Sequence, residues 1–184
     1  GNHGKVLKVF LNSKPHALKL YHKGLNVQYV NLQRALLHHR DAAEAKRQPG
    51  YAAVYHAAVP IGWVDHNGVV GLLFRFIESR PPHERQHATA EDRDQAKAQM
   101  EFLHWMGFCH LDITSRNLIL GRGGKCFLLD HDHCCEFGCA PLSDLPPESS
   151  ESIKAGFTAE REDDLHLWKH LQTTFFSDLP AEQL

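Results

Sequence analysis

The stretch that decides the fold is residues 110–130, HLDITSRNLILGRGGKCFLLD. It contains two apolar runs, Leu118–Leu120 and residues 126–129, separated by the glycine-rich residues 121–124. Short apolar runs on either side of a glycine-rich turn are typical of a β-hairpin. The stretch therefore predicts two short buried strands joined by a tight turn.

Three polar residues flank this expected hairpin. Asp112 and Asn117 precede its first strand, and Asp130 directly follows its second strand. Because the strands of a hairpin run antiparallel, residues before the first and after the second meet at one end. Carboxylate and amide oxygens suit magnesium. We therefore predict a phosphoryl-transfer site in which Asn117 and Asp130 hold the metal ion and Asp112 orients a nucleophilic hydroxyl. The alternative is that these residues only favour turns.

The segment resembles the catalytic loop of protein kinases, His-x-Asp-x-x-x-x-Asn, followed by a hairpin and a metal-binding aspartate. His110, Asp112, Asn117 and Asp130 are the matching residues. The wording HLDITSRNLIL, with Asp130-x-Asp132 in place of Asp-Phe-Gly, is most similar to fungal-type protein kinases. The resemblance implies an α+β, two-lobed protein kinase-like fold with a small β-rich N-lobe and a shortened helical C-lobe. It also implies ATP and Mg²⁺ as cofactors.

A lysine upstream fits the same resemblance. Lys19 stands inside the apolar, strand-like run ALKL, and a half-buried lysine is costly to desolvate unless an anion meets it. In a kinase that anion is the nucleotide phosphate, so the resemblance makes Lys19 a catalytic and cofactor-binding residue. The alternative is a lysine on an edge strand that points to solvent.

The first residues, GNHGKV, resemble the later half of a glycine-rich phosphate-covering loop. Gly1, Gly4 and Val6 would then bind the cofactor, because glycine lets backbone amides approach phosphates closely. A leading glycine can also be a remnant of expression. Further along, Phe76 and Ile77 are expected to bind adenine, as part of the segment that links the lobes.

Two later segments also match. Residues 147–148, Pro-Glu, resemble the end of a kinase activation segment. Asp164 resembles the aspartate that opens the central helix of the large lobe and anchors the catalytic loop through its backbone. The alternative for Asp164 is an ordinary acidic helix start, which the helix dipole favours.

One departure concerns the partner of the strand lysine. Kinases pair that lysine with a glutamate on the small-lobe helix, but the middle of the expected helix holds Gln33, Arg34 and His38. Asp41 and Glu44 are the acidic candidates farther along, and we favour Glu44.

Hydrophobic patterns predict the remaining elements. The expected elements are strands within 4–22 around a turn at 12–15, a helix over 26–47, strands near 54–64 and 69–77, and a helix capped by Thr89 with Asp92 three positions on. They divide the chain into an N-lobe at 1–80 and a C-lobe at 81–184.

The composition adds limits. The net charge is −2 and the pI about 6.8, which gives no electrostatic case for nucleic acid or membrane binding. No apolar run approaches the roughly 18 residues that span a bilayer. We therefore expect a soluble intracellular protein of the cytoplasm or nucleus. At 184 residues the chain is short for a complete two-lobed kinase, so a minimal or truncated version is expected.

The five cysteines suggest reduced thiols more than a disulfide framework. The histidines and cysteines of residues 131–139 could instead form a zinc site, although their spacing does not match paired structural ligands. The other interpretation is a histidine-rich activation segment.

Three functions remain open from the sequence. The leading one is a protein kinase that phosphorylates a hydroxyl of a protein substrate. A pseudokinase that only binds nucleotide or protein is favoured by the missing helix glutamate. A small-molecule kinase of the aminoglycoside or choline type is favoured by the pair Asp130 and Asp132.

Overall fold

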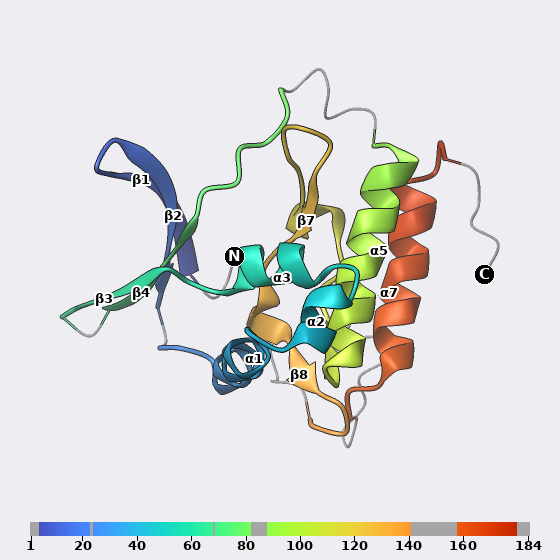
Figure 1. Cartoon of the computed structure of the whole chain (residues 1–184), viewed down its shortest axis with the longest axis horizontal. Coiled ribbons are helices and arrows are strands. Elements are labelled where there is room, and N and C mark those ends of the chain that lie inside the picture. Colours follow the sequence, from blue (N-terminus) through green and yellow to red (C-terminus); the bar gives the residue numbers. More distant parts are fainter. Residues whose placement is uncertain (1–3, 23, 68, 82–87, 141–157, 180–184) are drawn as a thin grey trace.

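The structure is a computed structural model that describes residues 4–22, 24–67, 69–81, 88–140 and 158–179. An antiparallel sheet lies on one side of the molecule, and a pair of long helices lies on the other (Figure 1). A hairpin and three shorter helices lie between the two. None of the helices in the described residues is long and apolar enough to cross a membrane.

The sheet has four strands in the order β1-β2-β4-β3. They are β1 (Gly4–Leu11), β2 (Lys14–Tyr21), β3 (Gly62–His66) and β4 (Val69–Arg75). The turn between β1 and β2 places Asn12 at φ 49° and Ser13 at φ 62°. Two left-handed residues make the tight turn that matches the twist of the flanking strands. The predicted pair of strands within 4–22 is therefore correct.

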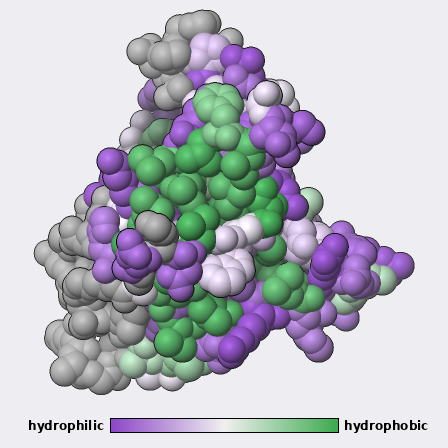
Figure 2. Space-filling model, turned by 90° about the vertical axis from the view of Figure 1, so that its left-hand side faces the viewer, coloured by the Kyte–Doolittle hydropathy of each residue, from purple (hydrophilic) through white to green (hydrophobic). Residues whose placement is uncertain are grey.

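The two faces of the sheet differ. Val6, Lys19 and Leu72 lie opposite one another on neighbouring strands, so their side chains share the inner face. On the outer face, Leu18 and Leu20 approach Gly71 closely. The view of this side shows hydrophobic residues gathered over the sheet (Figure 2). The sheet thus turns Lys19 toward the helices and leaves an apolar surface outside.

Three helices connect β2 to β3: α1 (Val27–His38), α2 (Ala43–Arg47) and α3 (Tyr51–Ala58). The single helix predicted over 26–47 is wrong, because the chain breaks after His38. The buried row of α1 ends at Leu36, and the next positions in that row are polar. The Tyr51 hydroxyl donates a hydrogen bond of 2.8 Å to the Arg40 carbonyl and fixes the chain at this break.

The strand predicted from residue 54 is also wrong. Residues 51–58, YAAVYHAA, form α3, and β3 begins only at Gly62. The run is rich in alanine, which favours helix. Its buried residues Val54 and Ala58 are four positions apart, which is the spacing of one helix face.

The helical lobe is built around a hairpin. Its elements are α5 (Ala90–Trp105), β5 (Phe108–Cys109), β6 (Leu118–Leu120), β7 (Cys126–Leu128), β8 (Cys135–Glu136) and α7 (Arg161–Thr174). The predicted hairpin is correct, with Leu118 opposite Leu128. The predicted start of α5 is also correct. The Thr89 hydroxyl accepts a hydrogen bond of 3.2 Å from Asp92 N, while the Asp92 carboxylate accepts one of 2.8 Å from Thr89 N.

Helix α5 closes the outer edge of β7. The Gln99 side chain is fully buried, accepts a hydrogen bond of 2.9 Å from Leu128 N and donates one of 3.0 Å to the Cys126 carbonyl. A strand edge would otherwise need solvent or another chain. Together with the buried Met100 and Trp168, these contacts hold the hairpin against α5 and α7.

The connection between the lobes is fastened to the same hairpin. Arg80 N donates to the Leu120 carbonyl at 2.8 Å, and Arg122 N donates to the Glu78 carbonyl at 3.0 Å. The Arg80 side chain also reaches the buried carboxylate of Asp92, with Nη1 2.9 Å from Oδ2. The segment from Glu78 to Arg80 is therefore fastened to the hairpin and to α5.

Candidate active site

The loop between β5 and β6 is anchored by one carboxylate from α7. Asp164 is fully buried, and its oxygens accept hydrogen bonds of 2.7 Å from His110 N and 2.8 Å from Leu111 N. Leu111 has φ 62°, a conformation that costs a non-glycine residue about 1–2 kcal/mol. Two charge-assisted hydrogen bonds at this point hold the backbone in place. The anchoring role predicted for Asp164 is correct.

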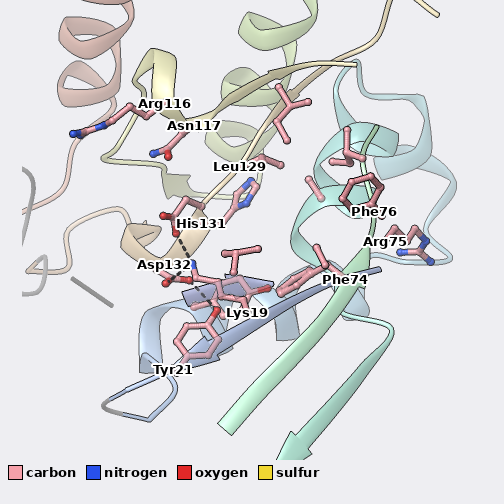
Figure 3. Close-up of a pocket in the computed structure, with 17 residues that line it drawn as sticks. Lys19, Tyr21, Phe74, Arg75, Phe76, Arg116, Asn117, Leu129, His131 and Asp132 are labelled. Carbon is pink, nitrogen blue, oxygen red and sulfur yellow. Dashed lines mark hydrogen bonds and ion pairs between the residues drawn. The ribbon is translucent and has the colours of Figure 1, made fainter. Parts of the chain in front are cut away.

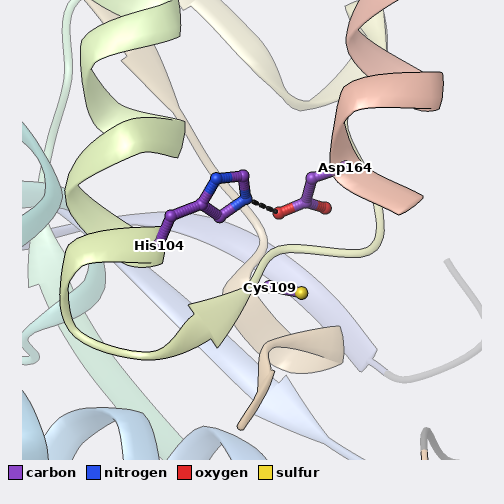
Figure 4. Close-up of side chains that lie close together, drawn as sticks. All are labelled: His104, Cys109 and Asp164. Carbon is purple, nitrogen blue, oxygen red and sulfur yellow. Dashed lines mark hydrogen bonds and ion pairs between the residues drawn. The ribbon is translucent and has the colours of Figure 1, made fainter. Parts of the chain in front are cut away.

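His104 and Cys109 complete a cluster around Asp164 (Figure 4). Their ligand atoms and a carboxylate oxygen lie within 4.8 Å of one another, and no other group of three potential ligands occurs in the described residues. However, His104 Nε2 is hydrogen-bonded to Asp164 at 2.9 Å, and Cys109 Sγ donates to the Glu160 carbonyl at 3.0 Å. Burial, followed by the nearby Asp164 charge, raises the pKa of the Cys109 thiol. The cluster therefore supports the loop through hydrogen bonds.

The zinc site considered for residues 131–139 does not form within the described part of the chain, because those histidines and cysteines make no group of three ligands there. Cys134 is instead fully buried in the core beneath α1. Burial raises the pKa of its thiol well above the usual range.

His110 joins the loop to the end of the hairpin. Its Nδ1 accepts a hydrogen bond of 3.2 Å from Asp112 N, and its Nε2 lies 3.1 Å from the Leu129 carbonyl. Asn117 adds two links: its Nδ2 donates to the Asp112 carbonyl at 2.9 Å, and its own carbonyl accepts from Leu129 N at 2.7 Å. These bonds fix the positions of Asp112, Asn117 and Leu129 relative to one another.

Asp112 stands out among these residues. The residue is only 7% exposed, and its Oδ1 is buried without a hydrogen-bond partner in the described part of the chain. Buried polar atoms are nearly always paired, so this carboxylate oxygen retains the capacity to accept a hydrogen bond.

Lys19 crosses from the sheet to the end of the hairpin. Its Nζ lies 2.6 Å from Asp130 Oδ1 and 2.6 Å from Asp132 Oδ2. Burial lowers the pKa of Lys19, but the two carboxylates outweigh burial and raise it. Burial alone would raise the pKa of Asp130, but the Lys19 ammonium lowers it by more, so the pKa of Asp130 lies below its usual value. Both groups are therefore charged near neutral pH.

The pairing of the strand lysine with Glu44 is corrected by this geometry. Glu44 is exposed on α2, a separate helix from α1, and does not line the cavity described below. Asp130 and Asp132 occupy the position next to Lys19 instead. The sequence analysis missed this role of Asp132 because Lys19 and Asp132 are far apart in the chain. The feature that could have indicated it is the second aspartate of the Asp-x-Asp pair.

Asp132 sits in the short turn of residues 131–133. Its Oδ1 accepts a hydrogen bond of 3.1 Å from the Tyr21 hydroxyl, and its carbonyl accepts one of 2.7 Å from Asn26 Nδ2. Asn26 is the residue that caps α1. The turn is therefore joined to both β2 and α1.

A cavity of about 370 Å³ opens between the sheet, the connecting segment and the hairpin (Figure 3). The apolar residues that line it include Val6, Phe74, Phe76, Ile77, Ile119 and Leu129. Lys19, Asn117, Asp130 and Asp132 are among the residues that supply polar groups to the wall. An apolar cavity of this size with a few converging polar groups is typical of a small-molecule site.

The cavity gathers most of the residues predicted to bind a cofactor. Val6, Phe76 and Ile77 line it, as do Lys19, Asn117 and Asp130, whereas Asp112 does not. Gly4 lies in β1, opposite Tyr21, and is not among the residues that line the cavity. Gly1 lies outside the described residues, as does the Pro-Glu pair at 147–148.

Comparison with models of protein families and with curated proteins gives no match. Among solved structures, the chain is similar to one entitled "Structure of vaccinia related kinase 3", with a TM-score of 0.65 and 17% sequence identity. The similarity covers 97% of this chain and 63% of that chain, so this chain spans less than two thirds of the other. At this identity the similarity shows the fold alone. The chain has the α+β, two-lobed protein kinase-like fold that the sequence predicted.

Proposed function

We propose that the protein is an ATP- and Mg²⁺-dependent phosphotransferase, a protein kinase that acts on a hydroxyl acceptor. One observation carries the proposal: Lys19 meets Asp130 across a cavity also lined by Asn117, whose side chain donates a hydrogen bond to the backbone of Asp112. Residues 1–80 then form the N-lobe and 81–184 the C-lobe. The similarity of the catalytic loop to fungal-type protein kinases is part of the proposal.

The residues present fit magnesium and a nucleotide. Asn117 and Asp130 offer an amide oxygen and a carboxylate, the ligand types that magnesium prefers. The Asp130 side chain is 42% exposed, so its oxygens are accessible from the cavity. When bound, the metal ion would neutralise charge on the transferring phosphate. Phe76 and Ile77 provide an apolar wall for a base.

Each residue of the site then has a separate role. Lys19 binds phosphate oxygens, and Asn117 and Asp130 hold the metal. Asp112 accepts a hydrogen bond from the acceptor hydroxyl and orients it toward the phosphate. Positioned acid–base groups contribute typically 10²–10⁴-fold to a rate, and the rest comes from alignment and charge stabilisation.

A small-molecule kinase of the aminoglycoside or choline type would use Asp130 and Asp132 together as metal ligands. The Asp132 side chain is only 4% exposed and is turned to Lys19 and Tyr21. This favours the protein kinase. An acceptor panel of basic proteins, aminoglycosides and choline separates the two by which compound receives phosphate.

The test measures nucleotide binding and phosphate transfer in parallel for the wild type, Asp112→Ala and Asp130→Asn. Asp112→Ala is expected to bind ATP within a few fold of the wild type and to lower transfer by roughly 100-fold or more. Asp130→Asn is expected to lose the affinity that magnesium adds. Asp94→Asn, with its side chain 62% exposed on α5, is the control.

The outcomes separate the functions. A wild type that binds nucleotide but transfers phosphate no faster than Asp112→Ala is a pseudokinase. A wild type that binds no nucleotide, with or without magnesium, refutes the proposed function.

A further inference from the structure

The two carboxylates that meet Lys19 have different surroundings. The side chain of Asp130 is 42% exposed, whereas that of Asp132 is 4% exposed. Both lie 2.6 Å from Lys19 Nζ. Both residues line the cavity, but Asp130 exposes much more of its side chain to a ligand there than Asp132 does.

Asp132 is also the more firmly held of the two. Its Oδ1 accepts a hydrogen bond from the Tyr21 hydroxyl at 3.1 Å, while Oδ2 faces Lys19. Tyr21 and Lys19 come from the same face of β2, two residues apart. The backbone of Asp132 is fixed separately by Asn26 Nδ2 at 2.7 Å. Because its carboxylate and its backbone are both held, the Asp132 side chain keeps one orientation.

We propose that Asp132 is a positioning residue that holds the Lys19 ammonium toward the cavity and so leaves Asp130 to bind the metal ion. This rests on the proposed nucleotide-binding function. A buried lysine needs a nearby anion. Once Asp130 is engaged with metal, Asp132 is the carboxylate that remains beside Lys19.

This arrangement differs from one in which a helix supplies the anion. Asp132 is two residues from Asp130 in the same short turn, so one backbone segment places both the metal ligand and the lysine anchor. Lys19 is then aligned as soon as β2 contacts this turn. No glutamate on a helix has to move toward Lys19.

The first test is a double-mutant cycle on nucleotide affinity. Asp132→Asn keeps the side-chain shape and removes the charge, and Lys19→Met keeps most of the length of the lysine. Asp132→Asn should weaken binding of magnesium ATP about tenfold in the wild type and at most about twofold in Lys19→Met, because contacting residues are not additive. Asp94→Asn should leave affinity unchanged. Equal weakening in both backgrounds overturns the proposal.

Magnesium separates an anchor from a metal ligand. In EDTA, Asp132→Asn should weaken ATP binding by the same factor as in magnesium, because Lys19 contacts phosphate directly. If the effect disappears without magnesium, Asp132 is a metal ligand and the proposal is wrong. A loss of affinity in Glu44→Gln that vanishes in Lys19→Met would return the anchoring role to Glu44.

A second cycle needs no nucleotide. Urea unfolding of the wild type, Lys19→Met, Asp132→Asn and the double variant should show that the double shifts the midpoint less than the sum of the single shifts. Additive shifts overturn the coupling. If the wild type binds no ATP, the proposed function fails, while this cycle still decides whether Asp132 holds Lys19. If Asp132→Asn does not fold, Tyr21→Phe takes its place in both cycles, with the same coupling to Lys19 expected.

Discussion

Replacing Asp164 with alanine removes the carboxylate that anchors the loop between β5 and β6. Asp164 accepts three hydrogen bonds, from His110 N at 2.7 Å, Leu111 N at 2.8 Å and His104 Nε2 at 2.9 Å. A hydrogen bond to a charged group contributes roughly 1.5–3 kcal/mol, and water entering the new space recovers part of the loss. We expect a loss of about 4 kcal/mol in the free energy of unfolding, a large share of the roughly 5–15 kcal/mol of a typical domain.

The measurement is urea unfolding at neutral pH, followed by tryptophan fluorescence, with Asp163→Ala as the matched control. Asp163 is the neighbouring residue and accepts a single cap bond of 2.8 Å from Glu160 N. Its loss should cost about 1 kcal/mol. Transfer should also fall more than nucleotide binding in Asp164→Ala, because the loop carries Asp112 whereas Lys19 meets the end of the hairpin. If both variants unfold at the same urea concentration, the anchoring argument is wrong.

Two further predictions concern pH and backbone conformation. Burial alone would raise the pKa of Asp92, but hydrogen bonds from Arg80 and Thr89 lower it below the ordinary 3.8. Its stabilisation is therefore present above that value and lost as the pH falls, so the difference in unfolding free energy between the wild type and Asp92→Asn should shrink below about pH 4. A difference that stays constant from pH 7 to pH 3 in urea titrations would contradict this. Gly50 and Gly107 have φ 82° and 84°, but a Cβ at Gly50 would overlap the Ala98 carbonyl oxygen, whereas Gly107 faces open space. Gly107→Ala should cost about 1–2 kcal/mol and Gly50→Ala at least about 2 kcal/mol more, so equal melting temperatures would refute the clash.

Local patterns in the sequence predicted the parts of the fold that depend on nearby residues. The hairpin at 118–128 follows from glycines between two apolar runs, and the start of α5 follows from Thr89 and Asp92. The helix at 51–58 was missed because a strand was predicted from residue 54, while the packing of Val54 and Ala58 on one helix face decided the outcome.

The candidate site was predictable where a motif sets the spacing. Asp112, Asn117 and Asp130 lie within one short segment, and a known pattern links them to Lys19. The partners of Lys19 were not predictable, because they depend on how β2 meets the turn at 131–133. That contact joins residues more than a hundred positions apart. No periodicity or composition encodes such a meeting.

The fastening of Glu78–Arg80 to the hairpin determines how the two lobes can move. Because this segment is tied to Leu120 and Arg122, a rotation of the sheet against the helices must take place before it, at residues 75–77. These residues line the cavity, so a base seated on them lies at the pivot of the motion. The Lys19 end of the cavity is fastened separately, because Lys19 meets Asp130 and Asp132 across it. Opening that end therefore requires these two ion pairs to break, in addition to rotation at residues 75–77.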